Sequence, residues 1–369
     1  MIINEKYLLT LLDTSYKVFL FEPNYDSRYI PLGLAKIASY LENQHKVVEY
    51  NRYYTGFPCD LVCISSMFTY DLEYVLNAIA EIRAYSNVPI IVGGVCASLL
   101  SDKFPHDVHV FAGCSVELDK TVPTYDMFDY RVAAPWNNFN HVFTTRGCVN
   151  RCAYCAVWRL EPEHYVVDGW EKLIYAPCKE HTMISDNNLS SFPEEHVTAV
   201  VDYLAYDSKP VIFDNGFDCK YITKTLATNL ARLKYYKQGL RLAFDRIDED
   251  GVFQSAVNML LDGAIIRLSI MAYVLFNFKD TLSAAHYRAS ECRKLGIKPF
   301  PQQYCPLTWT SRSKLYVGKH WSIPLIRAFR HYWREENLYQ DISLKQFAID
   351  HDDIYQFSKK DKDKISLLP

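Results

Sequence analysis

Residues 144–158 read TTRGCVNRCAYCAVW, and this stretch decides how the rest of the chain is interpreted. It places Cys148, Cys152 and Cys155 in a C-x3-C-x2-C run, directly after an apolar run that predicts a strand at 141–147. Three thiolates this close together in one loop can converge on a single metal centre. A 4Fe–4S cluster usually takes four thiolates, so a site with three leaves one iron open to bind something else. An open iron is typical of a catalytic centre.

Zinc is the competing metal for these thiols. Structural zinc sites close with four ligands, and no neighbouring residue completes a familiar finger spacing, although His164 and Cys178 remain as candidates. The remaining alternative is three unconnected buried cysteines, but free cysteines rarely recur so regularly in a loop.

Apolar runs and amphipathic segments alternate throughout the region after the cysteine run. Such a β/α series predicts a parallel sheet curved toward a barrel, with its chemistry at the carboxyl ends of the strands. The expected strands are 141–147, 181–187, 210–216, 240–246, 265–276 and 298–304, and the expected helices are 194–206, 220–237, 249–261 and 281–295.

The region before the cysteine run predicts a separate domain. Short apolar runs alternate with amphipathic stretches from Tyr16 to Cys114, which is typical of βαβ units on a parallel sheet. Gly93 and Gly94, at an expected strand end, allow a ligand or a helix to approach the backbone closely. The expected strands are 17–23, 46–51, 60–66, 88–94 and a short run ending at Gly113. One helix is expected to begin at Pro31 and another to cover 72–85.

These patterns predict an α/β protein of two domains. A doubly wound domain is expected over 1–122, a linker over 123–139, a partial barrel over 140–306 and a helical segment over 307–369. The mixed-sign run KKDKDK near the C-terminus is expected to be a solvated end.

Composition narrows the class of protein. Of the 369 residues, 49% are hydrophobic and 22% charged, which is enough for a sizeable core. A net charge of -3 lacks the basic excess that sequence-independent nucleic-acid binding requires. The 11 cysteines are an odd number in a long chain, which disfavours a disulfide framework. With no signal-peptide pattern and no apolar window of membrane-spanning length, the sequence predicts a soluble, cytoplasmic protein with reduced thiols and no membrane partner.

The cysteine run resembles the fingerprint of the radical SAM superfamily, C-x3-C-x-aromatic-C after the first strand of a partial (β/α)6 barrel. Cys148, Cys152, Tyr154 and Cys155 match it in full. The resemblance implies that the three cysteines ligate a 4Fe–4S cluster, that S-adenosylmethionine (SAM) chelates the open iron, and that Tyr154 lies at the cofactor. It further implies reductive cleavage of SAM to methionine and a 5'-deoxyadenosyl radical, which abstracts hydrogen from a substrate.

The same resemblance suggests which polar residues at strand ends bind SAM. The usual Gly-Gly-Glu motif at the second strand is absent, so Asp186, Asn187 or Asn188 would bind the SAM amino group, or would instead form an Asx turn that caps the next helix. At the fourth strand, Arg246 beside Asp245 would pair with the SAM carboxylate, or would form an ion pair within the chain.

The later strand ends supply the remaining candidates. Asn277 and Asp280 follow the fifth strand, where the family contacts adenine and ribose. Asp214 and Asp218, after the third strand, face substrate or merely cap. Cys305 is a substrate-side candidate for which a structural role is favoured.

The N-terminal domain resembles the cobalamin-binding-type domain that precedes the barrel in one branch of the superfamily. The runs PLGLAKIASYLE, DLVCISS and IIVGGVCAS carry this likeness. The D-x-H-x-x-G run that supplies a histidine ligand to cobalt is missing, and the matching turn reads NYDSRYIPLG. Some members bind cobalamin without that histidine and others lack the cofactor, so the resemblance leaves both readings open.

The sequence is therefore compatible with three functions. The first is a radical SAM enzyme that acts on a small molecule or peptide, with a reductant such as flavodoxin or ferredoxin. The second is a cobalamin-dependent radical SAM methyltransferase. The third, from a different class, is a non-catalytic iron–sulfur or zinc module, which the dispersed polar residues at strand ends disfavour.

Overall fold

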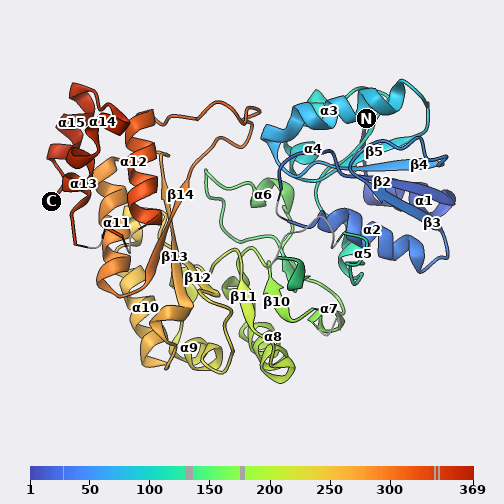
Figure 1. Cartoon of the computed structure of the whole chain (residues 1–369). Helices are drawn as coiled ribbons and strands as arrows, with labels where there is room; N and C mark the ends of the chain where they lie inside the picture. Colours follow the sequence, from blue (N-terminus) through green and yellow to red (C-terminus); the bar gives the residue numbers. More distant parts are fainter. Residues whose placement is uncertain (28, 129–135, 175–178, 336–337, 340) are drawn as a thin grey trace. The chain divides into compact units, whose positions relative to one another are not determined.

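The structure is a computed structural model of the whole chain, in which all residues except 28, 129–135, 175–178, 336–337 and 340 are described (Figure 1). Part of the expected linker and the zinc candidate Cys178 thus lie outside the described residues. The chain divides into two compact units. The first comprises Met1–Thr182 with Leu307–Lys314, and the second comprises Met183–Pro306 with Leu315–Pro369.

The first unit contains a parallel sheet in the order β1-β6-β5-β4-β2-β3. The order reverses between β2 and β4, since β3 lies beyond β2 on one side and β5 and β6 lie beyond β4 on the other. Ligands of doubly wound sheets bind at the carboxyl ends of the strands at such a reversal. The strands are β1 (Ile2–Ile3), β2 (Lys17–Phe21), β3 (Val47–Asn51), β4 (Leu61–Ser65), β5 (Ile90–Gly93) and β6 (His109–Phe111).

Helices cover both faces of this sheet (Figure 1). Val18 and Leu20 of β2 pack in one apolar cluster with α1 (Glu5–Thr14) and α2 (Leu32–Glu42), whereas Phe19 and Phe21 pack in a second cluster with α3 (Leu72–Arg83) and α4 (Val95–Leu99). Successive side chains of a strand point to opposite faces, so a strand buried on both faces is apolar throughout. The predicted doubly wound α/β domain is confirmed.

Two elements at the start of the chain were not among the predicted ones. Asn4 caps α1, its side chain accepting a hydrogen bond from the backbone N–H of Tyr7. Leu8 and Leu12, one helical turn apart, are buried under the sheet. β1 precedes this helix and pairs with β6 at the edge of the sheet.

The predicted strand at 141–147 is wrong as a single element. The first unit instead has β7 (Phe139–Val142), followed by β8 (Thr145–Arg146), which pairs antiparallel with β9 (Tyr165–Val166). The cysteine run leaves β8 and ends at the short helix α6 (Val157–Leu160). Its loop therefore lies between the two strands of a small ribbon.

The second unit contains the later strands and helices of the predicted series. β12, β13 and β14 form a parallel sheet in that order, and an isolated parallel bridge joins Phe217 to Leu242. The strands are β10 (His181–Ile184), whose first two residues still belong to the first unit, β11 (Val211–Phe213), β12 (Leu240–Ala243), β13 (Ile270–Phe276) and β14 (Lys298–Gln303). The intervening helices are α8 (Glu194–Asp207), α9 (Lys224–Leu230), α10 (Val252–Asp262) and α11 (Leu282–Lys294).

The chain ends in helices, as predicted, and most side chains of the KKDKDK run are exposed, as expected of a solvated end. KKDKDK lies in α15 (Lys359–Ser366), where Ser358 and Asp361 form a reciprocal capping box. Ile365 is buried, so the helix is fixed to the unit. The preceding helices are α12 (Ile323–Arg334), α13 (Leu344–Asp350) and α14 (Asp352–Tyr355).

Leu307–Lys314, which we call the returning segment, belongs to the first unit. The Arg312 guanidinium donates to both carboxylate oxygens of Asp71, at 2.9 and 3.2 Å, and to the carbonyl of Asp26 at 2.7 Å. The Thr69 hydroxyl donates to the carbonyl of Trp309 at 2.9 Å. The Asp71 side chain is fully buried, and burial raises its pKa although Arg312 opposes the shift. One arginine thus joins the loop after β2 to the loop after β4.

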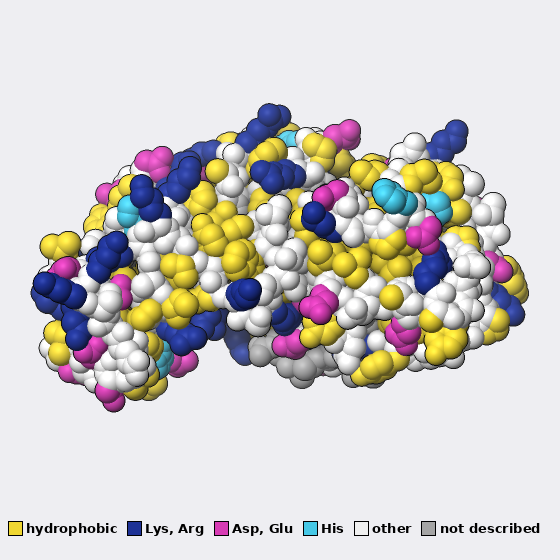
Figure 2. Space-filling model, turned by 90° about the horizontal axis from the view of Figure 1, so that it is seen from above, with side chains coloured by type: hydrophobic (Ala, Val, Ile, Leu, Met, Phe, Trp, Pro, Cys, Tyr) yellow, Lys and Arg dark blue, Asp and Glu magenta, His cyan; other side chains and the backbone are white. Residues whose placement is uncertain are grey.

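Among the described residues, no helix combines the length and the apolar character needed to cross a membrane. On the face drawn in Figure 2, Lys and Arg side chains are interspersed with hydrophobic and acidic ones. This distribution agrees with the near-neutral net charge.

Candidate functional site

The loop that carries the three cysteines begins at a glycine that no other residue can replace without strain. Gly147 has φ +82, a conformation that L-residues rarely adopt. A Cβ at this position would lie 2.0 Å from the carbonyl oxygen of Glu163. The backbone at the first cysteine is therefore fixed by close packing against the segment that returns to β9.

All three cysteines of the loop are half-buried and free of disulfides. The Asn150 N–H points at the sulfur of Cys148, and the Val157 N–H points at that of Cys155, each at 3.4 Å. The carbonyl of Cys152 accepts from the Cys155 N–H at 3.1 Å and from the indole N–H of Trp158 at 3.1 Å. Peptide N–H groups directed at sulfur are typical of iron–sulfur sites.

The sulfur atoms are not gathered around one point. Within the part of the chain that the structure describes, no three His, Cys, Asp or Glu side chains form a group that could hold a metal ion. Ligation of a cluster by Cys148, Cys152 and Cys155 thus stays a prediction, and it requires the side chains of the loop to turn toward one another.

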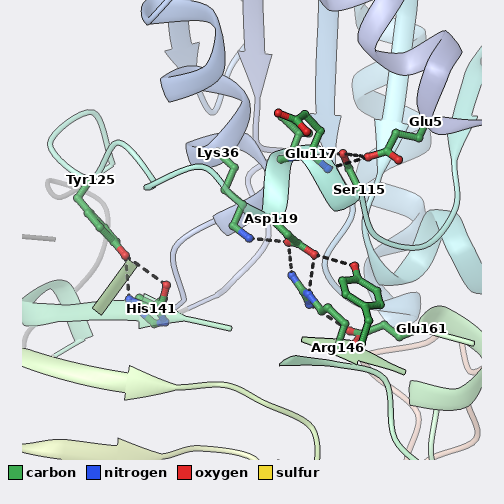
Figure 3. A network of polar contacts seen from close by, with 11 residues as sticks. Glu5, Lys36, Ser115, Glu117, Asp119, Tyr125, His141, Arg146 and Glu161 are labelled. Atoms are coloured by element: carbon green, nitrogen blue, oxygen red, sulfur yellow. Dashed lines mark hydrogen bonds and ion pairs between the residues drawn. The ribbon is translucent and has the colours of Figure 1, made fainter. Parts of the chain in front are cut away.

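A buried ion network lies next to this loop (Figure 3). Arg146 donates to both carboxylate oxygens of Asp119, at 2.8 and 2.6 Å, and the Lys36 ammonium donates to Asp119 at 2.6 Å. Arg146 also donates to Glu161 at 3.1 Å and lies over the ring of Phe143, 3.6 Å from its centroid. Two cations and two carboxylates therefore balance one another away from water.

The pKa values of this network follow from its geometry. Burial favours protonated Asp119, but the adjacent Arg146 and Lys36 outweigh that effect and lower its pKa. Burial lowers the pKa of Lys36 in spite of the carboxylate. Cys114 lies nearby, and burial raises the pKa of its thiol to about 12. This thiol is therefore neutral at neutral pH.

The network forms one end of a cavity of about 420 Å³ in the first unit. The rest of its wall is mostly apolar and comes from the start of α2 and from residues at and after the carboxyl ends of β4, β5 and β6, including Gly93 and Gly94. Lys36, Asp119 and Arg146 supply its charged groups. The cavity thus occupies the edge of the sheet where doubly wound domains bind ligands.

In the second unit, the residues after β10 are held by local contacts. Asp186 and Asn188 are buried. The Asn188 side chain accepts from the Ser190 hydroxyl at 2.9 Å and makes no side-chain cap to the following backbone. Helix α8 begins after Pro193, also without a side-chain cap. The predicted Asx cap of this helix is therefore not formed, and the role of Asp186, Asn187 and Asn188 toward SAM stays a prediction.

Asp214 meets an arginine that the sequence analysis did not single out. Arg241 donates to the carboxylate of Asp214 and, at 2.6 Å, to the hydroxyl of Tyr273. The Tyr273 hydroxyl donates to the carbonyl of Asp214 at 2.8 Å. Although burial opposes it, Tyr273 and Asp214 raise the pKa of Arg241, so the guanidinium stays charged.

The other candidates at these strand ends make contacts within the chain. Asp218 accepts from the Lys220 N–H at 3.2 Å and so caps a short turn. Asp245 accepts from the N–H of Leu275 at 3.2 Å. Arg246 is 54% exposed and pairs with Asp248 and Glu249, at 3.1 and 3.3 Å. Of the two predicted roles of Arg246, the structure thus contains an ion pair within the chain, formed with these two acids.

Asn277 is fully buried, with φ +67, and its side chain bonds to backbone groups. It donates to the carbonyls of Tyr304 and Tyr316, and it accepts from the N–H of Gly318 at 2.8 Å. Asp280 pairs at 2.7 Å with Arg288, whose side chain is 1% exposed. Cys305 is half-buried, and burial raises its thiol pKa.

The ion network and the cluster around Arg241 were not predicted from the sequence. A signal existed for Arg241, since it is a charged residue inside the expected strand 240–246. No comparable signal marked Asp119, whose partners Lys36 and Arg146 lie 83 and 27 residues away.

Comparison with known proteins shows where this architecture recurs. No protein-family model matches the chain, and no curated protein matches it. Two solved structures of TsrM, a radical S-adenosylmethionine methyltransferase from Kitasatospora setae, do resemble it. The one with cobalamin and a [4Fe-4S] cluster bound has a TM-score of 0.58 at 14% identity and covers 80% of this chain and 77% of that one. The one with tryptophan substrate and the SAM analogue aza-SAM has a TM-score of 0.57 at 14% identity, with coverages of 79% and 73%.

At this identity the likeness concerns the backbone and not the chemistry. It spans most of both chains, and the predicted α/β architecture agrees with it. The chain therefore has the fold of these two TsrM structures.

Proposed function

We propose that this protein is a radical SAM enzyme whose 4Fe–4S cluster is held by Cys148, Cys152 and Cys155. The observation that carries the proposal is the C-x3-C-x2-C run in the loop after β8, within a fold that recurs in a radical SAM methyltransferase. The sequence motif and the backbone likeness both favour this class of enzyme.

The donor set of the loop fits such a cluster. Three cysteine thiols outside any disulfide, with peptide N–H groups directed at two of the sulfurs, are the ligand type that iron–sulfur clusters take. When bound, a reduced cluster with an open iron supplies the electron that cleaves SAM into methionine and a 5'-deoxyadenosyl radical. The chain's own part is to present the thiols, which Gly147 does by fixing the backbone before Cys148.

We propose that SAM is bound by Tyr154 in the loop and by Asp186, Asn187 and Asn188 after β10. Asp186 and Asn188 are buried polar groups at a strand end, the kind of position from which sheets of this class present ligand contacts. Arg246 and Asn277 are weaker candidates, because their side chains already bond within the chain.

The substrate that we propose is a small molecule or a peptide. The net charge of -3 and the interspersed charges of Figure 2 give little attraction to a phosphate backbone. The electron would come from a reductant of the flavodoxin or ferredoxin type.

Anaerobic reconstitution with iron and sulfide tests this function. The loaded protein is expected to show the broad absorption of a 4Fe–4S cluster and to release 5'-deoxyadenosine with dithionite and SAM. A loaded cluster that cleaves no SAM under any reductant would refute the enzyme. One zinc and no iron by metal analysis would favour the non-catalytic module instead.

A cobalamin-dependent methyltransferase is the second candidate. The cavity of the first unit favours it, since this largely apolar space lies at the carboxyl edge of a doubly wound sheet. The TsrM structure of the same fold binds cobalamin. The cobalt-ligating histidine motif is absent from this chain, so binding would depend on contacts from the cavity wall.

Titration with hydroxocobalamin tests this second candidate, with Gly33 as the position to vary. Gly33 lies on the cavity wall, and an added Cβ would meet no atom within 4 Å. Gly33→Phe is expected to weaken binding, while Gly33→Ala, which adds one methyl group, leaves it nearly unchanged. Absence of any spectral change with the wild-type protein would remove this candidate.

A further inference from the structure

The network of Figure 3 joins two places in the first unit that have separate roles. One end lines the cavity, where Lys36, Asp119 and Arg146 form part of the wall. The other end reaches the loop of the cysteines, because Glu161 accepts from Arg146 at 3.1 Å and from the Gly147 N–H at 2.8 Å. A single chain of charge-assisted bonds therefore runs from the wall to the residue before Cys148.

Arg146 is the central member of this chain of bonds. Its planar guanidinium binds both oxygens of Asp119 with two donors and one oxygen of Glu161 with a third, a fork geometry that fixes the orientation of the side chain. The ring of Phe143 closes one face of the guanidinium. Side-chain exposures of 8% for Arg146 and 4% for Asp119 leave water little access to either partner.

Asp119 is the member on which the others depend, because it is the bidentate partner of Arg146. It is bound by both Lys36 and Arg146, and the hydroxyl of Tyr165 lies 3.4 Å from it. Without its charge, two buried cations would face the single carboxylate of Glu161. Arg146 would then have no bidentate partner on the side of the cavity, and its hold on Glu161 would loosen.

We propose that Asp119 is a positioning residue, which holds the cluster loop in place from the cavity wall through Arg146 and Glu161. This inference rests on the proposed function, in that the loop it positions is the one assigned to the cluster. Asp119 acts on the backbone of the loop through the side chains of Arg146 and Glu161.

The experiment compares Asp119→Asn with a double variant, Lys36→Met with Asp119→Asn. Asparagine keeps the shape but turns an N–H donor toward the donors of Arg146 and Lys36. The double variant removes one cation as well, so Arg146 and Glu161 balance again. Asp102→Asn serves as the control, since the Asp102 side chain is 71% exposed and pairs with its neighbour Lys103.

Hydrogen exchange of the Gly147 amide reads the positioning directly, because that amide bonds to Glu161. It is measured on the full-length protein before iron is added. Asp119→Asn is expected to exchange here roughly tenfold faster than the wild type or the control, the size expected for one lost charge-assisted bond. The double variant is expected to recover the melting temperature lost in Asp119→Asn but to keep the fast exchange.

Iron retention after reconstitution is the second readout, and both Asp119 variants are expected to retain less than the control. Unchanged protection of Gly147 in Asp119→Asn would overturn the inference. So would a double variant in which protection returns together with the melting temperature, since Asp119 would then serve only charge balance. If the wild type takes up no iron, the proposed function fails, and the exchange measurement alone decides the role of Asp119.

Discussion

Cys148→Ala is expected to reduce the iron content after reconstitution to background and to abolish release of 5'-deoxyadenosine. The loop offers three thiols, and a site left with two cannot hold a 4Fe–4S cluster. Cys148 directly follows the backbone fixed by Gly147, so no other thiol of the loop can take its place without a large shift. Iron analysis, the visible spectrum and product quantification measure the effect.

Cys59→Ala provides the matched control for this change. Cys59 is a half-buried free cysteine of the same unit that lies outside the loop, and burial raises its pKa. This variant should retain iron and activity close to those of the wild type. A Cys148→Ala protein with an undiminished cluster spectrum would show that the ligands lie elsewhere.

Gly147→Ala is expected to have the second-largest effect, on the stability of the first unit as well as on cluster loading. The left-handed conformation costs an L-residue about 1–2 kcal/mol. The new Cβ would also lie 2.0 Å from the Glu163 carbonyl oxygen, so the backbone must move, at a further cost of about 1–3 kcal/mol. The free energy of unfolding should therefore fall by about 2–5 kcal/mol, measured by denaturant titration.

Gly56→Ala separates the conformational cost of the left-handed backbone from the steric cost of the new Cβ. Gly56 has a similar φ of +72, but an added Cβ there would meet no atom within 4 Å. It should lose only the conformational part, about 1–2 kcal/mol, and should load iron normally. If both variants lost the same free energy of unfolding, the segment around Glu163 would move readily to make room for the Cβ and would not fix the loop.

Local pattern was sufficient to predict most elements of this fold. β2 and β4 are short apolar runs buried on both faces, and the helices that follow carry one apolar stripe, so each element shows in its own residues. The cysteine spacing likewise lies within one loop. The ribbon of β8 and β9 was missed, because two strands of two residues each leave no period to detect.

The contacts that decide the site could not be read from the sequence. Asp119, Lys36 and Arg146 are ordinary charged residues by pattern, and only the tertiary fold brings them together away from water. Asn277 follows a strand, as expected of a ligand contact, yet its amide satisfies backbone groups of a distant turn. The hydrogen-bond and ion-pair partners of a side chain depend on which distant segments the fold brings together. Local sequence pattern does not predict that.

The returning segment has a consequence for how the protein is made. The N-terminal unit receives Arg312 only when the ribosome has added more than three hundred residues, yet its Asp71 carboxylate is fully buried in the finished structure. Until that arginine is synthesised, the nascent unit has a charged group with no counterion at that position, which disfavours closing the loops after β2 and β4. Arg312 therefore joins the loops after β2 and β4 only once the strands of the second unit have been translated.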